Sequence, residues 1–175
     1  MRPNTQQLIQ RIGETDQLYL QGNQPKLAIE RAELRLELVT LSHLRQEQVY
    51  FLQEAIVILE QARIEFDEIS KALFMDLSLH LAKTYMLYFE ITREQRCAII
   101  TEQILKPYVS DEFGDLYFFL AYASISKQEK ALARHWLTKY SKTQAFDVLL
   151  VSEHHAFKPL REQDWFQSLV TQKMQ

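Results

Sequence analysis

The chain has few of the residues that interrupt regular secondary structure. Its 175 residues include three glycines and four prolines. Neither type occurs between Pro25 and Pro107. Because glycine and proline mark most turns and loops, residues 26–106 predict long helices joined by short turns. This absence argues against a loop-rich architecture and favours an all-α fold.

The sequence is also poor in cysteine, in continuous apolar runs and in excess positive charge. A single cysteine, Cys97, excludes an internal disulfide and a zinc site built from several cysteines. No segment approaches the roughly 18 consecutive apolar residues of a membrane span, and the first residues lack the apolar run of a secretory signal. The net charge is −3, with basic residues interspersed among acidic ones. We therefore expect a cytoplasmic protein with neither membrane nor nucleic acid as partner.

Hydrophobic residues make up 47% of the chain, enough for a packed core. Gly22 is expected to cap the first helix in the left-handed conformation. Thr92 with Gln95, and Ser126 with Glu129, match the capping-box pattern and predict two further helix starts. Eight or nine helices in antiparallel hairpins follow, over residues 4–21, 26–45, 47–64, 67–90, 92–106, 110–125 and 126–140, with one more after 143 and a short terminal helix after 159.

A repeat is visible in the second half of the chain. Tyr88 and Cys97, nine residues apart, recur 34 residues later as Tyr122 and Ala131. The segments around them resemble the tetratricopeptide repeat, whose 34-residue unit is a pair of antiparallel helices. In that family, an aromatic residue near the end of the first helix meets a small residue that opens the second. The resemblance implies an array of α-hairpins. An unrelated helical bundle is the alternative.

The C-terminal segment FKPLREQDWFQSLV carries a second resemblance. It is similar to the short element that closes many bacterial tetratricopeptide arrays. The matching positions are Phe157, Leu160, Arg161, Phe166 and Leu169. We accordingly expect one domain over residues 1–175, with irregular helices over 1–66, repeat-like hairpins over 67–152 and a closing element over 153–175.

Two segments, 81–91 and 113–123, are apolar on nearly every side of a helix. Such a helix lies at the centre of a bundle or lines a groove. The resemblance implies a concave apolar groove that holds a peptide or helix, lined by Leu79, Ala82, Met86, Phe89, Phe113, Leu116 and Leu120. The amphipathic segment 26–65 either packs on the domain's own core or forms a coiled coil or a partner-binding hairpin.

No residue pattern points to catalysis, to a metal site or to a cofactor. Cys97 falls where the repeat places a small buried residue. His154 and His155 are adjacent on the chain, so on a helix they would not converge on one metal. His135 is expected on a mostly buried helix face, as a core or edge residue. There is no glycine-rich phosphate loop.

We therefore predict a non-catalytic protein–protein interaction module, not an enzyme, whose partner is another protein. An adaptor or scaffold is the main interpretation. A chaperone for a secreted protein and an immunity protein that neutralises a toxin are the alternatives, and homo-oligomerisation is left open.

Overall fold

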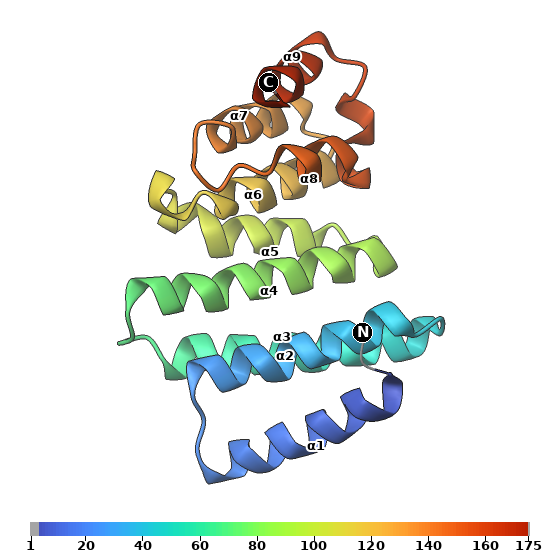
Figure 1. Ribbon diagram of the computed structural model, residues 1–175, viewed down its shortest axis with the longest axis vertical. Helices are drawn as coiled ribbons and strands as arrows, with labels where there is room; N and C mark the ends of the chain where they lie inside the picture. Colours follow the sequence, from blue (N-terminus) through green and yellow to red (C-terminus); the bar gives the residue numbers. More distant parts are fainter. Residues whose placement is uncertain (1–3, 175) are drawn as a thin grey trace. The chain divides into compact units, whose positions relative to one another are not determined.

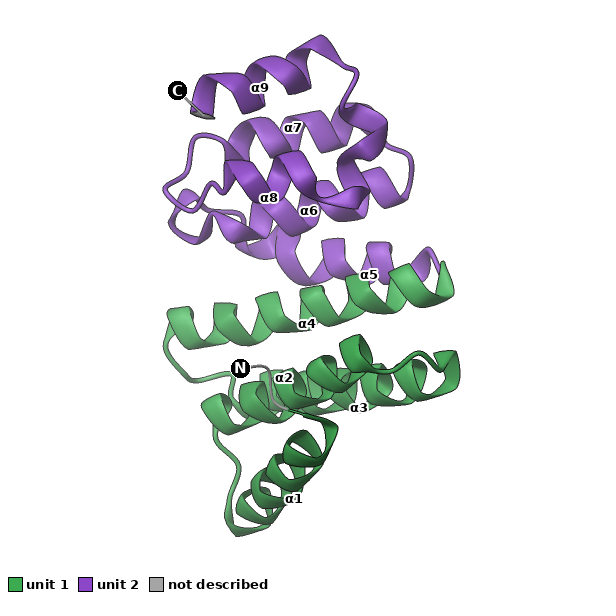
Figure 2. Ribbon diagram, turned by 45° about the vertical axis from the view of Figure 1, so that its right-hand side comes forward, with its two compact units in different colours: residues 1–93 green, residues 94–175 purple. Residues whose placement is uncertain are grey.

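The computed structural model describes residues 4–174 of the chain. Helix accounts for 81% of the described part, which contains no strand. The all-α prediction is therefore confirmed. Figure 1 shows the helices α1 to α9, with three short 3-10 helices among them. The chain divides into two compact units, 1–93 and 94–175, coloured separately in Figure 2. The division falls inside the predicted repeat region, and the expectation of a single domain stays a prediction.

Unit 1 contains four helices, each packed against the next in the chain. Their bounds are α1 Thr5–Gln21, α2 Pro25–Leu41, α3 Arg45–Glu65 and α4 Lys71–Thr92. Asn4 caps α1 in a capping box with Gln7. Proline opens α2, where its missing N–H costs nothing. These local signals place the helix starts close to the predicted positions.

The core of unit 1 lies between α2, α3 and α4. The buried face of α3 is formed by Ala55, Ile58, Leu59 and Ala62. Helix α1 joins the core through a smaller cluster, with Ile12 and Phe51 at its edge and Leu8, Leu34 and Leu38 at its centre. The remaining face of α3 is left to solvent.

The predicted helix boundaries at Thr92 and Ser126 are wrong. Both residues still lie in the preceding helix, where their hydroxyls donate to the carbonyls of Tyr88 and Tyr122 at 2.8 Å. Serine and threonine readily bond back in this way, which removes them as caps. The left-handed backbone that a helix end favours is supplied instead by Arg93 (φ 59°) and Gln128 (φ 64°).

Gly22 also differs from the prediction, although it does end α1. Its φ is 153° and its ψ is 136°, outside the left-handed helical region. This is a conformation that glycine adopts with ease because it has no Cβ.

Unit 2 is built from shorter helices around α6. Its elements are α5 Arg96–Leu105, η1 Lys106–Tyr108, η2 Asp111–Phe113, α6 Asp115–Ser126, α7 Lys130–Tyr140, α8 Val148–Glu153, η3 His155–Leu160 and α9 Asp164–Met174. Helix α6 packs against α5, α7 and η3. The ring of Phe118 lies 5.4–6.2 Å from the rings of Tyr122, Tyr140, His154 and Phe157. This aromatic cluster holds the C-terminal segment on α6.

The residues that resemble a closing element serve this attachment. Phe157, Leu160 and Phe166 are buried, whereas Leu169 is half-buried. Arg161 donates to the carbonyls of Glu153 and His154. The segment therefore covers part of the unit 2 core.

The structure corrects the prediction that Ala131 is the small packed residue of the second repeat. It is exposed, whereas Ala133, two residues later, is fully buried. The small residue that allows close packing of α7 is thus Ala133. The 34-residue spacing places Ala131 on the wrong side of the helix.

Candidate protein-binding surface

The predicted groove residues lie mostly in the core. Five of them are buried: Ala82, Met86, Phe89, Leu116 and Leu120. The expectation that these side chains stay open is therefore wrong. Helices apolar on all sides take central positions here, because α4 and α6 are each packed against more than one neighbouring element. Leu79 and Phe113 are half-buried, and their part in partner binding stays a prediction.

An exposed apolar line lies instead on α3. Tyr50, Val57 and Ile64 are 57%, 61% and 80% exposed. They follow one another at intervals of seven residues, so they lie on one face of the helix, two turns apart. We name these three residues the α3 stripe. The seven-residue spacing of these apolar residues is visible in the sequence. It was missed because the more numerous apolar residues of the buried face dominate the pattern of the same helix.

Polar side chains that contact α4 border the stripe on one side. The Gln53 amide donates to the Tyr88 hydroxyl at 3.3 Å. The Tyr85 hydroxyl donates to the Glu60 carboxylate. These hydrogen bonds fix Gln53 and Glu60 beside the stripe, whose three residues stay exposed.

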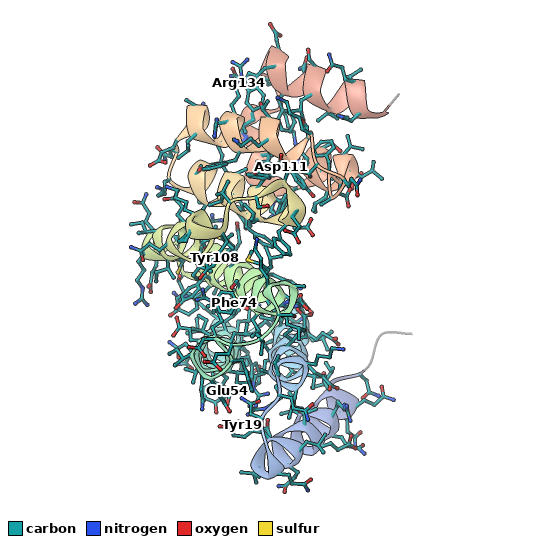
Figure 3. The ribbon with its side chains drawn as sticks, turned by 90° about the vertical axis from the view of Figure 1, so that its left-hand side faces the viewer. Tyr19, Glu54, Phe74, Tyr108, Asp111 and Arg134 are labelled. Atoms are coloured by element: carbon teal, nitrogen blue, oxygen red, sulfur yellow. The ribbon has the colours of Figure 1, made fainter. Side chains whose placement is uncertain are left out.

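On the other side, polar residues of α3 contact α1 and α2. Arg35 donates through Nε to Glu54 at 2.9 Å, and the Gln61 amide donates to the Tyr19 hydroxyl at 3.3 Å. Tyr19 and Glu54 are labelled in Figure 3. A groove of about 340 Å³ lies between α2 and α3 and includes two stripe residues; its lining is Arg31, Arg35, Tyr50, Gln53, Glu54, Val57 and Ile58. The stripe therefore borders a real depression in unit 1.

The wall of this groove is held by a buried arginine. The Arg35 side chain is 5% exposed and contacts Asp16 of α1 at 3.1 Å and Glu54 of α3 at 2.9 Å. A further hydrogen bond runs to the carbonyl of Arg31. Arg31 itself pairs with Asp16 and lies 4.1 Å from the centre of the Tyr19 ring. A buried charge needs such complete pairing, so the groove is a fixed feature of the fold.

Two glutamates border the stripe. Glu54 is paired with Arg35 of α2, and Glu60 accepts a hydrogen bond from Tyr85. Arg63 belongs to the same stretch of α3 and donates to the Ser78 hydroxyl of α4. The hydrogen bond to Glu54, together with its charge, raises the pKa of the Tyr50 hydroxyl. Tyr50 therefore stays neutral and contributes an aromatic ring with a hydrogen-bonded tip.

A second charged cluster joins α2 to α4. His80 lies 3.2 Å from Glu33 and 3.2 Å from Asp76, and Lys83 lies 3.2 Å from Glu33. Mainly through the hydrogen bond from His80, the pKa of Glu33 falls to about 2. Burial alone would lower the pKa of His80, but its bonds to Glu33 and Asp76 and their charges raise it overall.

The residues considered for chemistry are placed as follows. Cys97 is buried, as predicted, and burial raises the pKa of its thiol to about 11. The rings of His154 and His155 stack at 4.5 Å, and His154 accepts a bond from the Ala156 amide. His135 is exposed, so it is not a core residue. Within residues 4–174, no three His, Cys, Asp or Glu side chains are grouped to hold a metal ion.

The comparisons with known proteins give no relative. No protein-family model matches the chain. No curated protein sequence matches it, and no solved structure does. In the part of the chain that the structure describes, no helix is both long and apolar enough to cross a bilayer.

Proposed function

We propose that this protein is a non-catalytic interaction module that binds an amphipathic helix of another protein along α3. The observation that carries the proposal is the α3 stripe. Tyr50, Val57 and Ile64 are apolar, exposed and in line, and polar residues fixed by hydrogen bonds border them on both sides. Exposed apolar surface rimmed by polar groups is typical of protein-binding sites.

The spacing of the stripe defines the shape of the partner. From Tyr50 to Ile64 the helix rises about 21 Å. A partner helix of about 15 residues covers this length, with apolar side chains recurring every three or four residues, as in other helix-in-groove complexes. Its apolar face would enter the groove of about 340 Å³ beside Val57.

The charge of the surface defines the partner's flanks. Glu54 and Glu60 border the stripe on opposite sides, so lysine or arginine beside the apolar face of the partner is favoured. A second copy of this chain is disfavoured. An antiparallel pair of α3 helices centred on Val57 would set Glu54 of one copy against Glu60 of the other, and like charges repel. The partner is therefore a different, basic amphipathic helix.

The architecture that we propose for this module is a tetratricopeptide-like array of antiparallel α-hairpins serving as an adaptor or scaffold. It is supported by the packing of each unit 1 helix against the next and by the residues resembling a closing element. In such arrays, the surface left by packed helix pairs binds peptides and helices.

A synthetic helical peptide tests the proposal. The probe carries leucine at the apolar heptad positions and lysine beside them, and a control peptide carries glutamate in place of lysine. Binding to the full chain is measured by fluorescence anisotropy for wild type and for the double variant Val57→Asp with Ile64→Asp. The matched control variant is Ile9→Asp with Leu149→Asp, whose residues are 58% and 55% exposed and lie outside the stripe.

We expect the lysine peptide to bind the wild type and the control variant equally. It should bind the stripe variant at least tenfold more weakly, because aspartate in an apolar contact lowers the binding free energy by well over about 1.4 kcal/mol. The glutamate peptide should bind weakly throughout. Equal binding of the lysine peptide to the stripe variant and the wild type would place the site elsewhere. Tighter binding of the glutamate peptide would refute the charge argument.

A further inference from the structure

Unit 2 contains a groove whose chemistry is opposite to that of the α3 surface. It has a volume of about 570 Å³. We name it the α7 groove, and its lining residues are Asp111, Ala131, Arg134, His135, Thr138, Lys139 and Lys142. Figure 3 labels Asp111 and Arg134, which come from η2 and α7. Successive turns of α7, and Lys142 just after it, thus line the groove together with Asp111.

The cations of this groove are not neutralised within the protein. Among the residues that the structure describes, Arg134, Lys139 and Lys142 have no ion-pair partner, whereas Arg35 and Lys127 are paired with two acids each. Three cationic side chains therefore line one depression. Concentrating like charge without internal partners costs stability and favours an anionic ligand.

Two of the cationic side chains lie over aromatic rings. The Arg134 guanidinium lies 5.3 Å from the centre of the Trp165 ring, and the Lys139 ammonium lies 5.9 Å from that of Tyr117. A cation over a ring face keeps its N–H groups available for other acceptors. The rings therefore position these side chains and leave their donors for a ligand.

Asp111 restricts the kind of anion that fits. Its carboxylate accepts a hydrogen bond from the Tyr117 hydroxyl at 2.8 Å, and burial, together with this carboxylate, raises the pKa of Tyr117 to about 12. The Asp111 carboxylate is thus held in place beside the cations. A DNA backbone offers only acceptors and negative charge, so Asp111 repels it. A polypeptide offers carboxylates for the cations and backbone N–H groups for Asp111.

We propose that the α7 groove binds an acidic segment of a partner polypeptide. Helix α7 has 11 residues and spans about 16 Å, which matches about five residues of extended peptide. The recognised segment is therefore short and rich in glutamate or aspartate. The proposal concerns a surface of unit 2 and does not depend on the α3 stripe.

A labelled penta-glutamate peptide is the probe, and its binding to the full chain is measured by fluorescence anisotropy at low salt. The variant combines Arg134→Gln, Lys139→Gln and Lys142→Gln. The control combines Lys26→Gln, Lys158→Gln and Lys173→Gln, which remove the same charge from exposed positions outside the groove. Circular dichroism confirms that both variants are folded. A labelled oligothymidylate serves as the competing class of anion.

We expect the control to bind penta-glutamate like the wild type and the groove variant to bind it about tenfold more weakly, since each lost exposed pair costs up to about 1 kcal/mol. Asp111→Asn should strengthen oligothymidylate binding more than penta-glutamate binding. No binding by the wild type, or equal loss in the groove variant and the control, would overturn the proposal. Tighter binding of oligothymidylate than of penta-glutamate by the wild type would show a nucleic-acid site instead.

Discussion

The assignment of α4 to the core can be tested by truncating Met86, a side chain that is 1% exposed. Met86→Ala removes three heavy atoms, worth about 0.8 kcal/mol each in transfer free energy. The cavity that remains adds about 1 kcal/mol for each 40 Å³ that does not collapse. The free energy of unfolding should therefore fall by about 3 kcal/mol, a large part of the stability of an ordinary domain.

The measurement is equilibrium urea unfolding followed by far-ultraviolet circular dichroism, with Val57→Ala as the matched variant. Val57 is 61% exposed, and alanine is the better helix former, so Val57→Ala should leave the free energy of unfolding within about 0.5 kcal/mol of wild type. If Met86→Ala also stayed within that range, Met86 would be open to solvent. That result would contradict the burial of Met86 in the core of unit 1.

Three further outcomes can be measured. Gly114→Ala should lower the free energy of unfolding by about 1–3 kcal/mol, because its new Cβ would lie 2.4 Å from Thr143 Oγ1. Gly13→Ala should not destabilise the protein, because a Cβ added there would have no neighbouring atom within 4 Å. Gln128→Gly should raise the free energy of unfolding by about 0.5–1 kcal/mol, since glycine tolerates φ 64°, and a loss of stability would contradict this. Because the pKa of His80 is raised in the folded state, its ion pairs add stability that is fully present below pH 6.5 and is lost as the pH rises through the raised pKa. The difference in the free energy of unfolding between wild type and His80→Gln should therefore shrink with rising pH. A difference that grows with pH would contradict the pairing of His80 with Glu33 and Asp76.

The sequence predicts much of the fold because local signals and packing agree there. Asn4 and Pro25 mark helix starts, and Ala55 and Leu59 follow the buried face of α3. The turns were harder to predict. Arg93 adopts a left-handed backbone that sequence patterns assign to glycine, because tertiary packing outweighs the local preference of a single residue.

The candidate surface was harder to predict than the fold. A helix that is apolar on all sides either lies at the centre of the bundle or lines a groove. Which of the two applies depends on the helices packed around it. Met86 is covered, whereas Val57 is not. The α3 stripe can be read from the sequence as apolar residues seven apart. Its exposure depends on polar neighbours from other helices, such as Tyr85 and Arg35.

The most direct test of helix binding along α3 is site-specific photo-crosslinking in the native cell. A photoreactive amino acid is placed at Val57, which is 61% exposed, or at Leu149 of unit 2, a control that is 55% exposed. The crosslinked peptides are then identified by mass spectrometry. The account predicts that Val57 captures one segment with apolar residues at helical spacing and basic flanks, and that Leu149 does not capture it. Capture of this segment from Leu149, or capture at Val57 of segments without that pattern, would contradict it.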